Sequence, residues 1–277
     1  MKNTFAGKNV LLSGGSSGIG LALARLLAAE GAQVWLLARD ENRLQQALEQ
    51  VKASSSFQEA QHGILAADVC NPQQIEQAVR KMTATVGAPQ VLINAAGQAH
   101  PGNFIELDEQ IFRQLMEVNY FGTLNTIRAV LQPMIQQHSG MILNISSLAA
   151  VLGIWGYTAY GSSKFAVRGF TESLRAELKP HGIQVFLACP GDTDTPQLAY
   201  ENQYKPAETK QLAKFGGLMS AESVAESILT GLKKGHFLIL PGFDAKMTYW
   251  LVNLLGSKIH PLLDWIYAQA RKNNRGG

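Results

Sequence analysis

Short, almost entirely apolar segments alternate along this chain with longer segments of helical pattern, and this alternation limits the fold more than any other feature. Seven segments predict strands: Asn9–Ser13, Gln33–Ala38, Gly63–Ala67, Gln90–Asn94, Met141–Ile145, Gln184–Ala188 and Phe237–Leu240. Several lack polar alternation, as is typical of strands buried on both faces. The main helical patterns are Leu21–Glu30, Glu41–Lys52, Pro72–Val86, Asp108–Gln137 and Ser162–Lys179. Repeated strand–helix–strand units predict an α/β fold, a doubly wound sheet of about seven parallel strands with helices on both faces.

Length and composition set the scale of this fold. The 277 residues suffice for one large α/β domain. Of these residues, 46% are hydrophobic and 16% are charged, a core-rich composition that excludes a disordered chain. The net charge is only +3, and no Lys/Arg-rich run precedes the tail. We therefore expect no nucleic-acid partner.

The two cysteines, Cys70 and Cys189, each follow a predicted strand. Neither has a metal-type partner nearby in the sequence, so we expect two reduced thiols in a reducing compartment and no bound metal. Met1–Lys8 is short and polar, unlike a signal peptide, and no stretch is apolar over the length of a membrane-spanning helix. These features predict a cytoplasmic protein.

A glycine-rich segment, Ser13–Gly20, follows the first predicted strand and opens the first helix. Glycine lets the backbone approach a pyrophosphate closely, and a helix N-terminus presents free N–H groups and the positive end of a dipole. The spacing of Gly14, Gly18 and Gly20 differs from the common G-x-G-x-x-G pattern. Its place at the first strand-to-helix turn still predicts a dinucleotide site. The other residues of this loop that we expect at the cofactor are Ser16, Ser17 and Ile19.

The second predicted strand is followed by Arg39 and Asp40. An NAD site usually has an acid at this point to bond the ribose 2′-hydroxyl. Because the first polar residue is Arg39, whose guanidinium suits a 2′-phosphate, we predict NADPH, with Ser16 and Arg43 assisting. Two alternatives stay open: both arginines are solvated helix-start residues, and Asp40 caps the next helix.

A candidate acid/base pair lies at the start of the helix after the fifth strand. Tyr160 and Lys164 are four residues apart and therefore share one helical face. An ammonium close to a phenol favours the phenolate and lowers the pKa of the tyrosine, as an acid/base near neutral pH requires. Upstream, Ser146 and Ser147 follow the fifth strand, where a hydroxyl can bond a substrate oxygen or cap a turn.

Together these motifs resemble the short-chain dehydrogenase/reductase family over nearly the whole chain. The matching elements, in family order and spacing, are the Gly14–Gly20 loop, Asp68, Asn94–Gly97, Asn119, Ser147, Tyr160 and Lys164. The resemblance implies a Rossmann-type domain that reduces a ketone with a nicotinamide cofactor. The joint occurrence of these motifs is far more specific than any one of them.

The resemblance also implies roles for individual residues. Tyr160 would protonate the substrate oxygen, and Lys164 would lower the pKa of this tyrosine and bond the nicotinamide ribose. Ser147, rather than Ser146, would polarise the carbonyl, and Asn119 would hold a water near Lys164. The implied cofactor contacts are Asp68, Val69, Asn94, Ala95, Gly97, Pro190, Gly191, Thr193 and Thr195.

The segments Asp192–Pro196 and Phe165–Gly169 resemble those of the 3-ketodihydrosphingosine reductase branch. Its members reduce the ketone of a long-chain sphingoid base, so the resemblance implies a long-chain lipid ketone as substrate. Such a substrate carries an ammonium near the ketone, for which Asp192, Asp194 and Glu201 are candidate partners. The first two can instead cap the loop or the following helix. Two other functions stay open: reduction of another apolar ketone (steroid, retinoid or 3-oxoacyl substrate), and a non-catalytic NADPH-binding regulator.

Two segments stand outside the alternating pattern. Pro196–Ser220 is polar, and we expect it to be mobile. Beyond a main domain of residues 1–242, residues 243–277 form an apolar, aromatic extension with basic residues near its end. It predicts two short helices, Leu251–Leu255 and Leu262–Ile266, split by Gly256 and Pro261. This extension suits either peripheral contact with the cytosolic face of a membrane or an oligomer-forming or core-covering helix. The family resemblance implies a homodimer or homotetramer through the helices that hold Asn119 and Tyr160.

Overall fold

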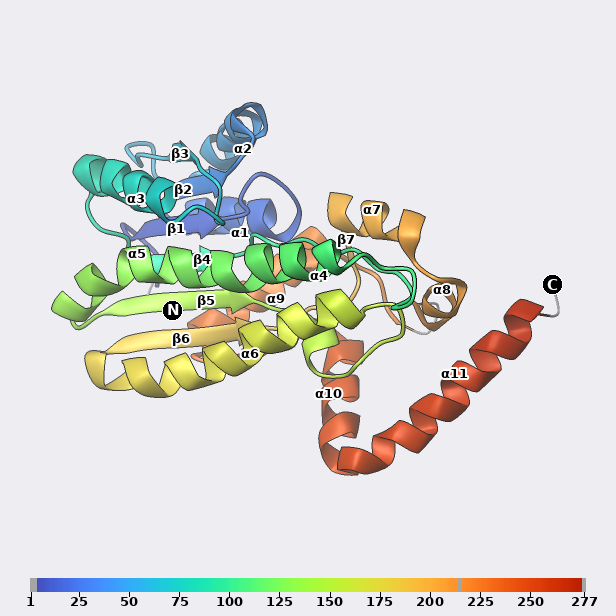
Figure 1. The fold of residues 1–277 in the computed structure, drawn as a ribbon. Coiled ribbons are helices and arrows are strands. Elements are labelled where there is room, and N and C mark those ends of the chain that lie inside the picture. Colours follow the sequence, from blue (N-terminus) through green and yellow to red (C-terminus); the bar gives the residue numbers. More distant parts are fainter. Residues whose placement is uncertain (1–3, 214–215, 276–277) are drawn as a thin grey trace.

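A computed structural model describes residues 4–213 and 216–275. Seven parallel strands form one sheet in the order β3-β2-β1-β4-β5-β6-β9 (Figure 1). Their bounds are β1 Asn9–Ser13, β2 Gln33–Ala38, β3 Gly63–Ala66, β4 Val91–Asn94, β5 Gly140–Ile145, β6 Ile183–Ala188 and β9 Leu238–Ile239. The order reverses beside β1, since the chain continues to β2 on one side and returns to β4 on the other. Ligands of doubly wound sheets bind at this point. The predicted fold is confirmed.

Helices cover both faces of the sheet (Figure 1). The apolar side chains of α1 (Gly18–Ala29), α2 (Glu41–Ser54) and α9 (Ala221–Lys233) form one core layer with one set of strand residues. The side chains of α3 (Pro72–Val86), α5 (Gly122–Gln136) and α6 (Thr158–Leu178) form the other layer with the alternate set. Burial on both faces is why these strands are solid apolar runs in the sequence.

A row of polar side chains crosses the sheet at the carboxyl ends of its central strands. Ser13 and Asn144 pair in register with Asn94 on either side. The Asn94 amide donates to Asn144 Oδ1 at 2.9 Å, and Asn94 Oδ1 accepts from the Thr126 hydroxyl at 2.7 Å. Asn144 in turn donates to Thr171 Oγ1 at 2.9 Å. These buried bonds tie three strands to α5 and α6.

The predicted helix Asp108–Gln137 is broken up in the structure. It consists of α4 (Glu109–Met116), a π-helical stretch (Glu117–Phe121) and α5, and Asp108 caps the first of these through Gln110 N at 2.7 Å. Helical periodicity in the sequence does not distinguish a π turn from an α turn. Such turns are rare and frequent at functional sites, and this one holds Asn119.

The segment Pro196–Ser220 is more ordered than a polar loop. It contains α7 (Pro196–Tyr204) and α8 (Ala207–Ala213), and β8 (Met219–Ser220) pairs with β7 (Thr193–Asp194). Thr195 caps α7 by accepting from Leu198 N at 3.3 Å, and Pro196 occupies its first position, where proline is favoured. The two helices lie beyond the carboxyl ends of the strands (Figure 1).

The C-terminal extension forms two helices longer than those predicted, α10 (Phe243–Leu255) and α11 (Ile259–Arg275). Helix α10 ends before Gly256, which has a φ of 51°. Pro261, in contrast, lies inside α11. Proline is tolerated there because the first turn of a helix has no backbone acceptor for its N–H groups. The helix α11 extends from the end of α10 back toward α8 (Figure 1), where Tyr267 and Arg271 pack on Trp155.

Within residues 4–213 and 216–275, no helix has both the length and the hydropathy needed to cross a membrane. The same residues contain no group of three or more His, Cys, Asp or Glu side chains placed to hold a metal. Cys70 is half-buried and Cys189 is buried, and both are free thiols.

Candidate active site

A cavity of about 690 Å³ opens beyond the carboxyl ends of the strands. Its wall runs from the glycine loop past the start of α6 to α7 and α10. The predicted site residues that line it are Gly14, Ser16, Ser17, Gly18, Ile19, Gly20, Arg39, Arg43, Asp68, Val69, Ala95, Gly97, Ser147, Tyr160, Lys164, Pro190, Gly191, Thr193 and Thr195. Asn94 and Asn119 are instead buried, with 3% and 1% of their surfaces exposed.

The glycine loop packs tightly against the segment after β4. Gly14 has a φ of 72°, and a Cβ on it would lie 2.5 Å from the backbone nitrogen of Ala96, so this position excludes any larger residue. The helix α1 begins at Gly18, which also has a positive φ of 53°. The free N–H groups of this helix end line the cavity, and they form a cradle that fits a pyrophosphate.

Arg39 and Arg43 are exposed and line the same end of the cavity. Asp40 caps α2, since its carboxylate accepts from Arg43 N at 3.0 Å and lies 3.4 Å from Arg43 Nε. The capping alternative for Asp40 is therefore confirmed. Asp40 is thus engaged with its own helix, whereas the Arg39 side chain has no ion pair or hydrogen bond with any other described residue.

Asp68 and Val69 follow β3 at the same end. One carboxylate oxygen of Asp68 accepts from Cys70 N at 3.0 Å. The Val69 carbonyl accepts from Asn125 Nδ2 at 2.9 Å, which joins this loop to α5. Both residues line the cavity together with Arg39, so this end offers an apolar side chain next to a carboxylate.

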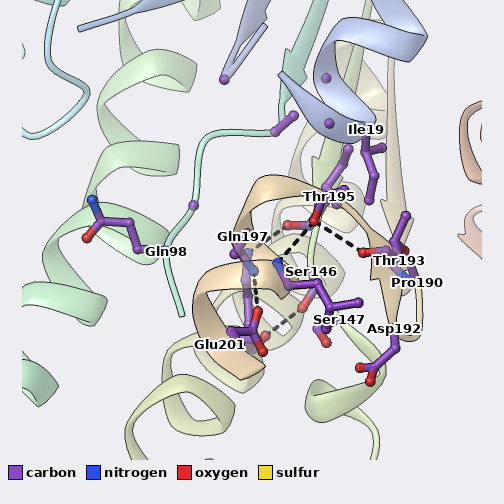
Figure 2. Close-up of a pocket in the computed structure, with 18 of the residues that line it drawn as sticks. Ile19, Gln98, Ser146, Ser147, Pro190, Asp192, Thr193, Thr195, Gln197 and Glu201 are labelled. Atoms are coloured by element: carbon purple, nitrogen blue, oxygen red, sulfur yellow. Dashed lines mark hydrogen bonds between the residues drawn. The ribbon is translucent and has the colours of Figure 1, made fainter. Parts of the chain in front are cut away.

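The loop after β6 closes the opposite side of the cavity. Its residues Pro190 and Gly191 precede Thr193, whose hydroxyl donates to the Gly191 carbonyl at 3.0 Å. The Thr195 hydroxyl donates to the Thr193 carbonyl at 3.2 Å (Figure 2). Both threonine hydroxyls therefore donate within the loop itself.

Ser146 and Ser147 have different surroundings. Ser146 is buried, and its hydroxyl donates to the backbone carbonyl of Lys164 at 2.9 Å. Ser147 Oγ accepts from Ala149 N at 3.1 Å and hydrogen bonds to the Tyr160 phenol. The hydroxyl of Ser147, and not that of Ser146, therefore lies with the phenol of Tyr160.

Tyr160 and Lys164 are brought together on α6, as their spacing predicts. Burial lowers the pKa of Lys164 to about 8. The pKa of Tyr160 is raised above its usual value, first by burial and then by the charge of Glu201, against the effect of hydrogen bonds with Ser147 and Gln197. The expected lowering of the tyrosine pKa is thus wrong for this structure, because desolvation of the phenolate is the largest effect on this pKa.

Asn119 sits behind Lys164 in the π-helical turn. Its Oδ1 accepts from Gln98 N at 2.8 Å, and its Nδ2 donates to the Gln98 carbonyl at 2.9 Å and to Ser163 Oγ at 2.8 Å. A Cβ added to Gly97 would meet both Asn119 Oδ1 and Lys164 Nζ, at 3.1 and 3.2 Å. Glycine at this position therefore lets the amide and the ammonium approach one another.

The three candidate partners for a substrate ammonium lie in different places. Asp192 pairs with the buried Lys205 at 3.1 Å, and Asp194 is exposed and outside the cavity lining. Glu201 is 6% exposed and lines the cavity. Neither aspartate caps α7, a role that Thr195 fills.

Two further residues of the site carry no motif in the sequence. Tyr157 donates to Glu201 Oε2 at 2.5 Å, and Gln197 donates to Glu201 Oε1 at 2.9 Å. Figure 2 shows Gln197 and Glu201 side by side, with Asp192 apart from them. The spacing of Gln197 and Glu201 by four residues is the one signal that places them on the same face of a helix.

The sequence matches the family described as short chain dehydrogenase over residues 8–206. It is 38% identical over 242 residues to the 3-dehydrosphinganine reductase of Danio rerio, which covers 87% of this chain and 73% of the relative. It is 35% identical over 255 residues to the 3-ketodihydrosphingosine reductase of Dictyostelium discoideum, covering 87% of this chain and 76% of the relative.

The structure is similar to a short chain dehydrogenase/reductase from Burkholderia phymatum solved in complex with NAD. That comparison has a TM-score of 0.80 and 25% identity, and it covers 91% of this chain and 94% of the other. Actinorhodin polyketide ketoreductase, solved with NADPH, gives a TM-score of 0.75 and 28% identity over 84% and 95% of the two chains. The chain therefore belongs to the short-chain dehydrogenase family of oxidoreductases.

Proposed function

We propose that this enzyme reduces the ketone of 3-ketodihydrosphingosine to dihydrosphingosine, using NADPH. The observation that carries the proposal is the 38% identity with the zebrafish reductase along 87% of the chain. The site supports it chemically, because two hydroxyl groups, those of Tyr160 and Ser147, meet inside the cavity.

In this reaction the Tyr160 phenol gives its proton to the ketone oxygen. Its raised pKa keeps it in the acid form at neutral pH, as a proton donor needs. Ser147 donates a hydrogen bond to the same oxygen and thereby stabilises the charge that develops there. The glycine loop would hold a nicotinamide dinucleotide, which when bound would supply the hydride.

Lys164 and Asn119 serve Tyr160 after it has lost its proton. The Lys164 ammonium stabilises the phenolate and bonds the nicotinamide ribose. Asn119 holds a water near Lys164, so that a proton from solvent can return to the tyrosine. The proposal is supported by the approach of Asn119 and Lys164 around Gly97.

The preference for NADPH comes from the end of the cavity next to β2. We propose that Arg39 binds the 2′-phosphate, with Ser16 and Arg43 assisting. A guanidinium binds a phosphate with two parallel charge-assisted hydrogen bonds. The engagement of Asp40 as a helix cap removes the acid that an NAD site would use.

We also propose that residues 243–277 form a separate extension through which the protein contacts the cytosolic face of a membrane peripherally. Large apolar side chains on α10 and α11 are exposed: Phe243, Met247, Trp250, Leu254, Leu262 and Trp265. The exposed Lys246, Lys258 and Arg271 add positive charge, which suits an anionic lipid surface. Phe243 also lines the cavity, so a lipid chain could pass from this surface to the site.

A homodimer or homotetramer is the oligomeric state that we propose. The helices that hold Asn119 and Tyr160 each expose a phenylalanine, Phe121 and Phe165, at 42% and 43%. Large exposed aromatic side chains are enriched at protein interfaces. Contact between copies through these helices would bury both.

The test of the substrate is NADPH consumption by the purified protein with three ketones, 3-ketodihydrosphingosine, a 3-oxoacyl thioester and a steroid ketone. We expect a clear preference for the sphingoid ketone in kcat/KM. Turnover of another ketone alone would overturn the substrate while leaving the reductase chemistry intact. Cofactor binding without turnover of any of the three would favour a regulatory protein.

A further inference from the structure

A single carboxylate lies in the cavity wall next to the proposed proton donor. Glu201 is 6% exposed, and both of its oxygens accept hydrogen bonds from neutral donors, Tyr157 Oη at 2.5 Å and Gln197 Nε2 at 2.9 Å. Burying a carboxylate without a cation is costly. Burial accordingly raises the pKa of Glu201, while these two bonds act against the rise.

Lys205, the cationic residue closest to Glu201 in the sequence, is already paired with another carboxylate. The Lys205 ammonium, with a side chain 2% exposed, lies 3.1 Å from Asp192 Oδ2. That pair sums to zero charge and leaves the charge of Glu201 without a direct cationic partner among the ion pairs of the described residues. Next to Tyr160 the cavity wall therefore carries a carboxylate, that of Glu201, which an incoming cation can match.

The position of this carboxylate fits a cation attached next to the reacting ketone. The Gln197 side chain hydrogen bonds to both Glu201 and the Tyr160 phenol. The rings of Tyr157 and Tyr160 lie 5.5 Å apart between their centroids. Glu201 is thus linked to the phenol through one side-chain amide. A ketone whose oxygen bonds the phenol would therefore bring an amine on its neighbouring carbon toward Glu201.

We propose that Glu201, held by Tyr157 and Gln197, binds the ammonium group of an α-amino ketone substrate and so determines specificity for amino ketones over other apolar ketones. This inference rests on the proposed function, since it assigns the residue that selects the sphingoid head group. Asp192 and Asp194 do not share this role, because the first is paired with Lys205 and the second is outside the cavity lining.

The experiment pairs a charge-removing substitution with a charge-free substrate. Wild type, Glu201→Gln and a control, Asp194→Asn, are assayed with two short-chain, water-soluble ketones. One is the amino ketone with the sphingoid head group, and the other is the same molecule with hydrogen in place of the amine. Asp194→Asn removes an exposed carboxylate at the end of β7, just before α7. Thermal unfolding of all three proteins checks that they fold alike.

We expect Glu201→Gln to lower kcat/KM for the amino ketone by roughly 10- to 100-fold, the loss of one charged hydrogen-bonded contact. The change for the amine-free ketone should stay within about threefold, and Asp194→Asn should alter neither substrate. An equal loss on both ketones, or no loss on either, would overturn the role of Glu201 and leave the proposed function standing. Wild-type turnover of the amine-free ketone alone would overturn the proposed function itself.

A measurement on wild type covers the case in which Glu201→Gln fails to fold. Calorimetric titration of the NADP⁺-bound enzyme with the short-chain amino alcohol product and with its amine-free counterpart compares their affinities directly. Tighter binding of the amino alcohol, by roughly tenfold or more, supports an ammonium site. Equal affinity for the two alcohols contradicts it.

Discussion

The Lys164 ammonium nitrogen lies 5.8 Å from the centre of the Tyr160 ring, one helical turn further along α6. Both side chains are buried, at 5% and 8% exposure. Burial favours the neutral form of each group, so it raises the pKa of the phenol and lowers that of the ammonium to about 8. At neutral pH Tyr160 therefore enters the reaction with its phenol protonated.

Replacing Tyr160 by Phe removes this proton donor and keeps the ring. We expect kcat to fall by roughly 100- to 10,000-fold, the usual contribution of general acid catalysis, while the affinity for NADPH changes little. Steady-state kinetics and fluorescence titration of NADPH measure the two effects. Tyr120→Phe, on the π-helical turn outside the cavity lining, is the matched control, and full activity of Tyr160→Phe would exclude the proposed acid.

Replacing Arg39 by Ala should weaken NADPH far more than NADH. The expected rise in KM for NADPH is roughly 10- to 100-fold, from loss of charged hydrogen bonds to the 2′-phosphate. Arg80→Ala serves as the control, because Arg80 is an exposed residue of α3 paired with Glu76. An unchanged ratio of the two cofactors would place the phosphate on other residues.

Lys164 gives the stability of the cofactor-free protein a pH dependence. The pKa of this lysine is about 8 in the folded state against an ordinary value of 10.5, so the unfolded chain binds more protons between these values. Stability rises with pH wherever the unfolded state binds more protons. Burial of the charged lysine therefore costs on the order of 3 kcal/mol below about pH 8, and this cost fades as the pH approaches 10.5.

The variant Lys164→Met isolates this contribution, since all other groups titrate alike in both proteins. The free energy of unfolding in urea, variant minus wild type, should be largest at neutral pH and shrink steadily above about pH 8. A difference that stays constant with pH would show that the ammonium is not desolvated in the folded protein.

Lipid contact by the C-terminal extension predicts a loss of vesicle binding on removing its apolar side chains. Trp250 and Leu254 lie one turn apart on α10, 62% and 63% exposed. The double variant with serine at both positions should bind anionic phosphatidylserine vesicles at least roughly 100-fold more weakly, since each buried side chain contributes about 1.5–3 kcal/mol. Phe57→Ser is the control, because Phe57 is 47% exposed in a loop far along the chain. Equal co-sedimentation of all proteins would contradict membrane contact.

Association through the exposed aromatic residues of the π-helical stretch and α6, Phe121 and Phe165, predicts a change of mass in solution. A glutamate in place of Phe165, which is 43% exposed on α6, would place a charge in the proposed contact and dissociate the oligomer. Sedimentation equilibrium measures the mass of wild type and variant. A monomeric wild type would exclude the proposed assembly.

Local sequence was enough to predict most of the sheet and the cofactor loop. All seven sheet strands match their predicted segments to within one residue at either end, and helix Pro72–Val86 has the predicted bounds. These elements follow from patterns within one strand or helix, such as continuous apolar runs and caps. Gly14 and Gly18 could be assigned to the cofactor loop for the same reason. Both have a positive φ, which the strand-to-helix turn requires and which glycine adopts without strain.

The sequence by itself determined the doubly wound fold, the Tyr160–Lys164 pair and the arginine after β2, because each depends on spacing along a single element. Only the tertiary structure decided which of the candidate acids that line the cavity is paired with a lysine and which is not. The Tyr157–Glu201 bond joins residues 44 positions apart, and the pairing of Asp192 with Lys205 depends on how α7 folds over the site. The direction in which the pKa of Tyr160 shifts likewise depends on the tertiary structure. Sequence spacing gives the distance to a neighbouring charge, but desolvation depends on everything that surrounds the group.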